Sequence, residues 1–249
     1  MPRLSGVMIV KNEALNLKAC LDSAGFCDEW VVIDSGSSDG TAELARTLGA
    51  KVWERPFDDY ASQKNFGIQK ASGEWVLLLD ADERVSEGLK EEIQTALRVP
   101  TADGYQMRRL NRIFGRWMKH GANQEDLQLR LAKRSKAVFH GPVHERVRPE
   151  GKIARFKEPL FHHSTGTIAD YMRKLNVYTS LEAAHLSGKA NPPLVRRLKA
   201  LPLARLGQLI FLKRAFLDGL EGVLFAILSA YYDFVSLAKH WENSQKGVS

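Results

Sequence analysis

Residues 30–41 read Trp-Val-Val-Ile-Asp-Ser-Gly-Ser-Ser-Asp-Gly-Thr. The apolar, β-prone start predicts a short buried strand, and the small polar residues after Asp34 predict a turn into a helix over 39–48, with Ser38 or Asp39 as N-cap. A carboxylate in that place can accept hydrogen bonds from a nucleobase imide or from ribose hydroxyls. The simpler interpretation is an ordinary strand-to-helix turn with a capped helix.

Working outward, the same alternation of strand and helix covers the first hundred residues. Further strands are predicted at 6–10, 51–53 and 75–79, and further helices at 13–24, 58–71 and 86–97. This alternation predicts an α/β fold in which helices cover both faces of a mostly parallel sheet. Ligands bind such sheets at the carboxyl ends of the strands.

The second half has a different character. Short apolar runs between 104 and 161 predict an irregular β region. From Thr167 onward the spacing is helical, with a break at Asn191-Pro192-Pro193 and two further helices over 203–216 and 219–240. We therefore expect a catalytic domain over 1–165, made of halves 1–100 and 101–165, and a helical extension over 166–249.

The strand predicted at 75–79 leads into Asp80-Ala81-Asp82-Glu83, three carboxylates within four residues. Residues i and i+2 of an extended chain point the same way, so Asp80 and Asp82 are expected to face one ligand. Two close carboxylates repel unless a cation lies between them, and hard oxygen ligands suit Mg²⁺ or Mn²⁺. A solvated turn before a helix that begins near Ser86 explains the same spacing.

The first strand also ends in polar residues, Lys11-Asn12-Glu13. Alone, this is an ordinary helix start. Together, the three strand ends resemble the nucleotide-sugar-binding half of family 2 glycosyltransferases of the GT-A fold. That family carries Asn-Glu, then Asp-x-Gly-Ser-x-Asp-Gly-Thr, then Asp-x-Asp after successive strands, and the resemblance covers residues 5–98 closely.

The rest of the chain is similar to the branch that contains lipopolysaccharide-core β-1,4-glucosyltransferases. The shared features are Gln63-Lys64-Asn65, Asp80-Ala81-Asp82-Glu83, Asp126-x-Gln128-x-Arg130-Leu131, Val143-His144-Glu145, His162-His163-Ser164, Asp170-Tyr171 through Lys174-Leu175-Asn176, and Phe216-x-Asp218-Gly219. One departure is Ala132-Lys133, where relatives tend to carry Phe-Arg.

The resemblance implies roles for the donor side of a reaction centre. Glu13, next to Asn12, and Asp34 would hold the base and ribose of a nucleotide sugar. Lys64 would lie near the pyrophosphate, unless it is an exposed helix lysine. Asp80 would bind ribose, or the metal through water.

It also implies roles for the metal and the acceptor side. Asp82 would bind Mg²⁺ or Mn²⁺ directly, neutralising the leaving diphosphate. His162 is a candidate third ligand or a hydrogen-bonded histidine in a packed loop. Inversion needs a base that takes the acceptor's proton. Glu145 is the first candidate, and Asp126 is the second unless it pairs with Arg130 or another cation.

The net charge and the distribution of basic residues indicate which partners the protein can bind. The chain of 249 residues has a formal net charge of +7, which suits a phosphate-bearing ligand or an anionic membrane surface. No acidic residue occurs between Ala183 and Leu217, where basic and apolar residues alternate as in membrane-surface helices. Two other interpretations compete with membrane binding. The basic face is simply solvated, or the last predicted helix, over 219–240, packs on the catalytic domain or forms a homodimer. No nucleic-acid motif accompanies the charge.

Other segments limit the location of the protein. The N-terminus shows no signal-peptide pattern. The stretch 223–232 is too short to span a bilayer, so no spanning helix is expected. Cys20 and Cys27 are expected to be free thiols in a reducing cytosol.

The expected function is transfer of glucose from UDP-glucose to a lipopolysaccharide-core or other lipid-linked acceptor, by a cytoplasmic enzyme on the inner face of the membrane. A sugar-nucleotide nucleotidylyltransferase would want a glycine-rich phosphate loop after the first strand, where this chain has Lys11-Asn12-Glu13. A nucleotide-sugar-binding module without transferase activity is the third possibility, although the carboxylates of Asp80, Asp82 and Glu145 are intact.

Overall fold

The computed structural model describes residues 2–123, 126–140, 146–147, 151–186 and 194–246. The chain forms two compact units. The first, here the sheet unit, comprises Met1–Arg109 and Leu127–His162. The second, here the helical unit, comprises Leu110–Asp126 and His163–Ser249.

The sheet unit confirms the predicted α/β fold. Its parallel strands, in spatial order, are β3 (Lys51–Glu54), β2 (Glu29–Asp34), β1 (Leu4–Val10) and β4 (Trp75–Leu78). The chain first adds strands on one side of β1 and then places β4 on the other side. This reversal brings the carboxyl ends of β1 and β4 together at a switch point, where open α/β sheets bind ligands.

Antiparallel strands continue the sheet beyond β4. β8 (Leu127–Lys133) pairs with β4, and β6 (Gly104–Ile113) pairs with β8. β5 (Glu83–Val85) pairs with β12 (Leu160–Thr165). Short pieces complete the β structure: β7 (Arg116–Met118), β9 (Phe139–His140), β10 (Arg146–Val147) and β11 (Ile153–Arg155). The irregular β region predicted for 104–161 is therefore real, and it includes longer strands than the sequence suggested.

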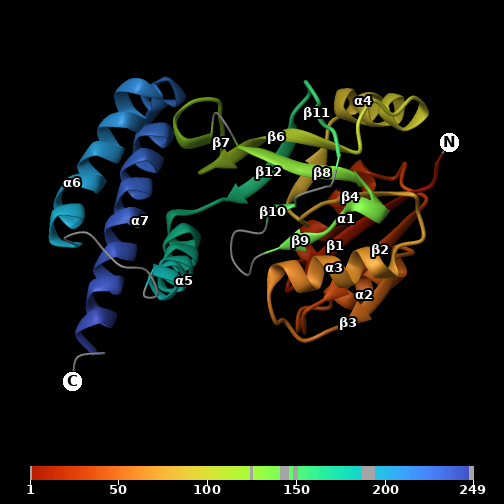
Figure 1. Cartoon of the computed structure of the whole chain (residues 1–249), viewed down its shortest axis with the longest axis horizontal. Helices are drawn as coiled ribbons and strands as arrows, with labels where there is room; N and C mark the ends of the chain where they lie inside the picture. Colours follow the sequence, from red (N-terminus) through yellow and green to blue (C-terminus); the bar gives the residue numbers. More distant parts are fainter. Residues whose placement is uncertain (1, 124–125, 141–145, 148–150, 187–193, 247–249) are drawn as a thin grey trace. The chain divides into compact units, whose positions relative to one another are not determined.

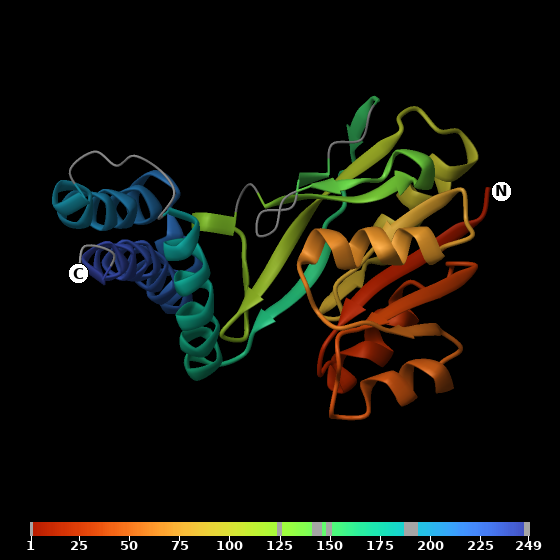
Figure 2. The ribbon, with the colours of Figure 1, turned by 60° about the horizontal axis from the view of Figure 1, so that its bottom comes forward.

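Helices cover both faces of the sheet (Figures 1 and 2). On one face, α1 (Ala14–Ser23), α2 (Thr41–Thr47) and α4 (Glu87–Arg98) pack against alternate strand residues such as Met8, Val32 and Leu77. On the other face, α3 (Tyr60–Lys70) packs against the intervening residues, including Val7. This alternation follows from the two-residue repeat of a strand. Because both faces are covered by helices, the polar side chains that follow the strands lie at the edge of the sheet.

Two local predictions were wrong. α2 begins at Thr41, and its N-cap is Gly40 in the left-handed conformation (φ 84°) rather than Ser38 or Asp39. The Asp39 carboxylate instead accepts hydrogen bonds from the backbone N–H of Ala14 and of Thr41, which joins the starts of α1 and α2. The second error concerns 79–82, which form a turn after β4 because the Glu83 N–H donates to the Asp80 carbonyl (2.9 Å). The extended geometry assumed for Asp80 and Asp82 is absent.

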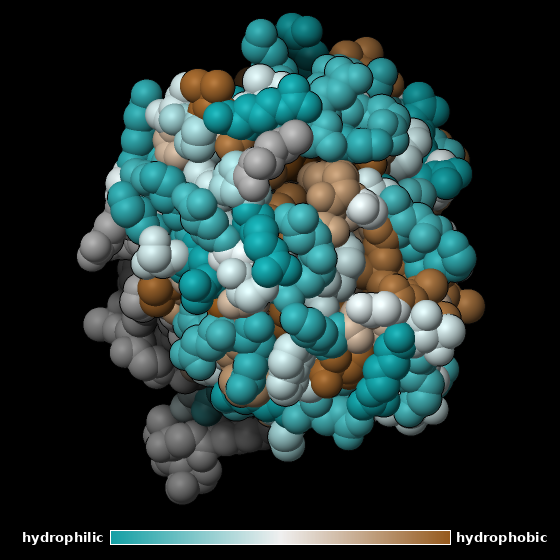
Figure 3. Space-filling view, turned by 90° about the vertical axis from the view of Figure 1, so that its right-hand side faces the viewer, coloured by the Kyte–Doolittle hydropathy of each residue, from teal (hydrophilic) through white to brown (hydrophobic). Residues whose placement is uncertain are grey.

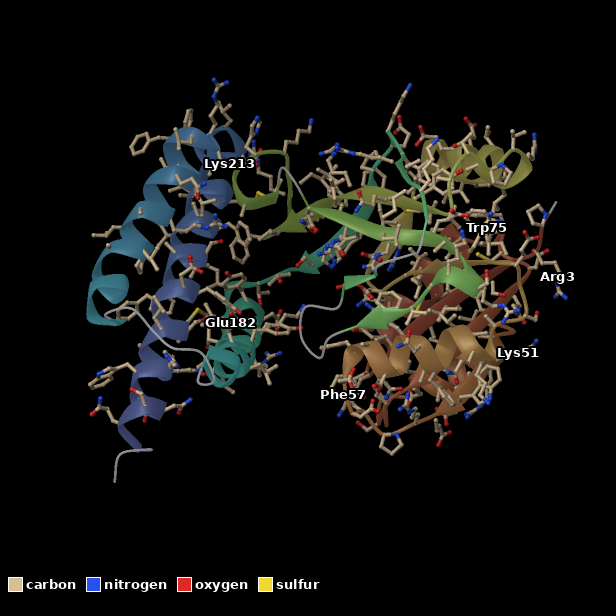
Figure 4. All side chains as sticks on the ribbon, viewed as in Figure 1. Arg3, Lys51, Phe57, Trp75, Glu182 and Lys213 are labelled. Carbon is tan, nitrogen blue, oxygen red and sulfur yellow. The ribbon has the colours of Figure 1, made fainter. Side chains whose placement is uncertain are left out.

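The amino ends of the strands are joined through one carboxylate, that of Glu29 at the start of β2. It accepts hydrogen bonds from Ser5 (2.6 Å), from the backbone N–H and hydroxyl of Ser72, and from Lys51 (2.7 Å, labelled in Figure 4). Burial raises the pKa of Glu29, but these hydrogen bonds outweigh burial and lower it to about 2. Glu29 therefore ties β1, β2 and the start of β4 together in its ionised form.

Replacing Glu29 with glutamine is expected to lower the free energy of unfolding by about 2 kcal/mol at pH 7. A folded-state pKa below the unfolded value stabilises the fold above the unfolded pKa of about 4.3, and this contribution disappears as the pH falls toward 2. The difference between wild type and Glu29→Gln, measured by urea denaturation, should therefore shrink between about pH 5 and pH 2. Glu54→Gln, at an exposed pair with Arg46, is the control and should change little. An equal difference at all pH values would contradict this role.

The helical unit contains α5 (Ile168–Leu186), α6 (Leu194–Gly207) and α7 (Gly219–Lys246). α6 and α7 lie side by side in both ribbon views (Figures 1 and 2). The predicted single helix over 203–216 is wrong. α6 ends at Gly207, a π-helical turn covers Gln208–Leu212, and Arg214 adopts the left-handed conformation (φ 52°) before a 3₁₀ turn at Ala215–Asp218.

The last helix is longer than the sequence suggested. Residues 215–245 form one stretch long and apolar enough to cross a bilayer by length and composition, and 28% of its apolar window is buried inside the structure. The sequence-based expectation counted only 223–232. The helix continues because 233–245 remain helix-compatible and pack against α5. Its length therefore allows this helix to span a bilayer. Whether it does so depends on the contacts that α7 makes within the helical unit.

Candidate active site at the carboxyl ends of the parallel strands

The loops that follow β1 and β2 are joined by hydrogen bonds. The Asn12 N–H donates to the Ser37 hydroxyl (2.9 Å), and the Asn12 side-chain oxygen accepts from the Ser38 N–H (2.8 Å). Asn12 is held with a positive φ of 57°, a conformation that asparagine tolerates better than most residues. The Glu13 N–H donates to Thr41 (2.9 Å). The two predicted donor-binding residues of the first motif therefore shape the second loop.

Asp34, at the end of β2, is 2% exposed. One carboxylate oxygen, Oδ1, accepts the backbone N–H groups of Gly36 (2.9 Å) and Ser37 (2.8 Å). The other oxygen, Oδ2, is buried and receives no hydrogen bond from any residue in the described part of the chain. A buried carboxylate oxygen without a donor is costly, so this atom is a strong candidate to accept a hydrogen bond from a ligand.

The predicted Asp-x-Asp pair divides into two environments, and Asp80 lies in an ion cluster. Its carboxylate is 2.6 Å from the Arg130 guanidinium, which also contacts the fully buried Glu83. Burial raises the pKa of Asp80, but the charges of Arg130, Lys64 and Arg109 outweigh it and hold that pKa well below its usual range. Asp80 is therefore ionised at neutral pH.

The Glu83 carboxylate links the backbone of Asp80 to the guanidinium groups of this cluster. One carboxylate oxygen accepts the Asp80 N–H (3.0 Å), and the other contacts Arg130 and lies 3.6 Å from Arg109. Burial raises the pKa of Glu83, and Arg130 opposes that effect. No site role was predicted for Glu83 or Arg109, and Arg130 was considered only as a partner for Asp126. Glu83 was visible as the third carboxylate of its motif, but its partner lies 47 residues away.

The motif Gln63-Lys64-Asn65 lies on α3 and faces inward. Lys64 is buried, and its ammonium group lies over the Phe139 ring at 5.2 Å, so it is not an exposed helix lysine. Asn65 exchanges two hydrogen bonds with the Phe139 backbone (3.0 and 2.9 Å). Gln63 donates to the carbonyl groups of Arg55 and Pro56. These contacts fix β9 against α3, and the Lys64 charge lies close enough to Asp80 to lower the pKa of its carboxyl group.

Asp82 and His162 come together through the pairing of β5 with β12. Asp82 Oδ2 and His162 Nε2 are 3.2 Å apart, and both side chains are mostly buried. Two ligands on one octahedral ion with metal–ligand bonds near 2.1 Å lie about 3 Å apart, so this pair fits Mg²⁺ or Mn²⁺. Within the described ranges, no three His, Cys, Asp or Glu residues are arranged so that together they could hold a metal ion. The protein residues present therefore fit a metal whose other positions are filled by substrate phosphate and water.

The two candidates for general base differ in what can be described. Glu145, with Val143 and His144, lies outside the described residues. Asp126 belongs to the helical unit, where its carboxylate accepts a hydrogen bond from the Asn111 side chain (3.0 Å). Arg130, considered as a partner for Asp126, contacts Asp80 and Glu83. Both base assignments remain predictions.

The comparisons with known proteins agree with this arrangement. The model of glycosyl transferase family 2 matches residues 5–177. A lipopolysaccharide core biosynthesis glycosyltransferase, LpsC of Rhizobium meliloti, is 29% identical over 96% of this chain and 92% of its own length.

Two solved structures share the fold. The mannosyltransferase PcManGT from Pyrobaculum calidifontis, in complex with GDP-Man and Mn²⁺, aligns with a TM-score of 0.57 at 17% identity, over 96% of this chain and 87% of that one. Glucosyl-3-phosphoglycerate synthase from Mycobacterium tuberculosis, with Mn²⁺, UDP and its product, aligns at 0.51 and 18% identity, over 76% and 81%. With a family model that covers most of the sequence and a fold that agrees, the chain belongs to glycosyl transferase family 2.

Proposed function

We propose that this glycosyltransferase is inverting and transfers glucose from UDP-glucose to a lipopolysaccharide-core or other lipid-linked acceptor. The family membership supplies the transfer of a sugar, and the similarity to LpsC points to a lipopolysaccharide acceptor. The single observation that supports the donor class is the buried Oδ2 of Asp34, which receives no hydrogen bond from the described residues. Asp34 ends β2, and only β1 separates that strand from β4, which leads to Asp80.

The donor fits the chemistry of that edge of the sheet. Asp34 Oδ2 can accept the imide N–H of uracil, which cytosine lacks. Asp80, fixed by Arg130, is oriented to accept ribose hydroxyls or a metal-bound water. Lys64 supplies positive charge beside it. Two proteins of this fold were solved with a nucleotide or nucleotide sugar and Mn²⁺, so this class of ligand is the first to test.

The proposed metal ligands are Asp82 and His162, with Asp80 contributing through water. A bound Mg²⁺ or Mn²⁺ would neutralise the charge that develops on the leaving diphosphate. The protein's own contribution is to hold Asp82 and His162 close together and to keep Asp80 ionised. An acceptor hydroxyl must lose its proton as it attacks, and Glu145 is the proposed base, with Asp126 as the second candidate.

The location follows from the acceptor. A lipid-linked sugar chain is found at a membrane, and a basic surface suits an anionic bilayer. We therefore place the enzyme on the inner face of the cytoplasmic membrane, with residues 1–165 as the catalytic domain and 166–249 as the membrane-associating extension.

Replacing Asp34 with asparagine is expected to weaken UDP-sugar binding about ten- to hundredfold, because the amide preserves the turn but can place a donor where an acceptor is needed. Calorimetric titration with UDP measures the change, and a thermal melt checks that the fold is intact. Unchanged affinity in a folded variant would show that Asp34 Oδ2 does not contact the base.

The proposed function is tested by acceptor-free hydrolysis of a panel of nucleotide sugars, with Mn²⁺, with Mg²⁺ and with a chelator. Glycosyltransferases often pass the sugar slowly to water, so release of UDP from UDP-glucose only in the presence of metal is the expected result. Cleavage of a different sugar nucleotide would replace glucose in the proposal. Metal-dependent binding without cleavage or transfer to any acceptor would favour the binding-module alternative.

A further inference from the structure

A compact apolar segment lies at the bend between α6 and α7, and we name residues 211–220 the elbow. Five large apolar side chains in the elbow are each between 48% and 77% exposed: Phe211, Leu212, Phe216, Leu217 and Leu220. Isolated exposed leucines are common, but five large exposed apolar side chains within ten residues are a concentration that soluble surfaces rarely carry. By contrast, the face in Figure 3, on the side of β2 and α4, is mainly hydrophilic with apolar residues in separate small areas.

The conformation of the elbow is held by buried contacts. Leu209, just before the elbow, and Ala215, within it, are each 1% exposed and pack with Ala226 of α7. The Asp218 carboxylate accepts the backbone N–H of His120 (2.7 Å) and contacts its ring (2.9 Å). The Gly121 N–H donates to the Lys213 carbonyl (2.8 Å). Because these residues fill the interior, the five apolar side chains are directed outward by a fixed backbone.

Positive charge surrounds the elbow. Lys213, labelled in Figure 4, and Arg214 lie in the middle of its sequence, and Arg214 is exposed. The neighbouring β7 hairpin adds exposed Arg116 and Lys119; the Arg116 guanidinium lies beside Gly219. Asp218 is the one acidic residue in 205–220, and it is buried against His120. Just past the elbow, Glu221 pairs with Arg116 (3.8 Å). The surface therefore combines apolar side chains with an excess of cations.

This combination matches the boundary between lipid headgroups and acyl chains. Apolar side chains enter that boundary while lysine and arginine reach the phosphates, and each basic side chain near an anionic surface contributes about 1 kcal/mol.

A helix that spans the bilayer fits the packing of α7 less well. The Lys239 ammonium of α7 donates to Asn176, Thr179 and Ser180 of α5, with distances of 2.7 to 2.9 Å. Ser236 and His240 of α7 are also buried in the helical unit. Insertion across a bilayer would separate these groups from their partners in a medium that cannot replace them.

We propose that the elbow, Phe211–Leu220, inserts into the surface of an anionic bilayer, with Lys213 and Arg214 contacting lipid phosphates. This inference rests on the proposed function, because a lipid-linked acceptor gives the enzyme a reason to bind a membrane. Vesicle binding can nevertheless be measured without any donor reaction. The elbow would bring the enzyme to its acceptor without a spanning segment.

The test is co-sedimentation of the full chain with vesicles of phosphatidylcholine, with and without about one third phosphatidylglycerol. The double variant Phe211→Ser/Leu212→Ser should lower the partition coefficient onto anionic vesicles at least about tenfold. Lys213→Gln/Arg214→Gln should lower it at low salt and remove most of the preference for phosphatidylglycerol. The matched control is Val177→Ser/Leu181→Ser on α5, which removes two exposed apolar side chains from another place and should change little.

Four outcomes would overturn the inference. Elbow variants could bind vesicles as well as wild type, or the α5 control could lose as much binding. Wild type could resist extraction from membranes at alkaline pH, which would indicate a spanning helix. Elbow variants could instead convert a dimer into a monomer in light scattering while vesicle binding persists. Donor hydrolysis separates the two claims, because elbow variants should retain it even when vesicle binding is lost.

Discussion

Replacing Asp82 with alanine is expected to lower the rate of sugar transfer at least about a thousandfold, because it removes the carboxylate proposed to hold the metal at the leaving diphosphate. Asp82 lies 3.2 Å from His162, and both side chains are mostly buried. The measurement is kcat for donor hydrolysis and transfer across a Mn²⁺ titration. His162→Ala should have a smaller effect, about ten- to hundredfold, and should raise the Mn²⁺ concentration needed for half-maximal rate.

The control for Asp82 is Asp22→Ala, which removes an exposed carboxylate paired with Lys18 on α1. It should leave the rate and the metal dependence unchanged. If Asp82→Ala kept more than a tenth of the wild-type rate with the same Mn²⁺ dependence, the metal would have to bind elsewhere, and the assignment of both Asp82 and His162 would be wrong.

The second large effect concerns stability. Arg130→Met is expected to lower the free energy of unfolding by about 3–5 kcal/mol, because it leaves the buried carboxylate of Glu83 and the Asp80 carboxylate facing each other with less positive charge. Arg130 is 4% exposed and Glu83 is fully buried, so water cannot replace the lost contact. Urea denaturation monitored by tryptophan fluorescence measures the change.

A double variant tests whether the effect comes from the uncompensated carboxylate. Adding Glu83→Gln to Arg130→Met should recover part of the lost stability, since the neutral amide tolerates burial better than a carboxylate. Arg46→Met, which breaks an exposed pair with Glu54, should change stability by less than about 1 kcal/mol. A loss no larger for Arg130→Met than for Arg46→Met would contradict the view that this cluster supports Asp80.

The first hundred residues were predictable because their signals are local. Runs such as Trp30–Ile33 identify strands, and the helix predicted over 86–97 is α4, which Ser86 caps by accepting the Leu89 N–H with its hydroxyl. Each strand end then carries its polar residues to the same edge of the sheet. The resemblance to a family added the roles, and the family match over residues 5–177 confirms that identification.

The ion cluster was not predictable, because its members are joined by the register of an antiparallel pair. Leu77 lies opposite Leu131 in β4 and β8, and that register places Arg130 beside Asp80 and Glu83. Nothing in the spacing of the two motifs fixes this register. The consequence is that Asp80 and Asp82, which look equivalent in sequence, occupy different environments.

The bend between α6 and α7 was missed for a similar reason. Residues 203–216 have a continuous helical pattern, and the interruption depends on tertiary contacts of the Lys213 and Asp218 groups with His120 and Gly121. Those partners lie about a hundred positions earlier in the chain, in a hairpin whose place the sequence does not reveal. The exposure of Phe211 and Leu212 is a product of that bend.

The central claim is that the carboxyl ends of β1, β2 and β4 bind a nucleoside diphosphate together with a divalent cation. Its most direct test is calorimetric titration of the full chain with UDP, first with Mn²⁺ and then with a chelator. The account predicts saturable binding with Mn²⁺ that weakens at least about tenfold without it, and loss of that difference in Asp82→Ala. Failure of the folded wild-type chain to bind UDP or GDP under either condition would contradict it.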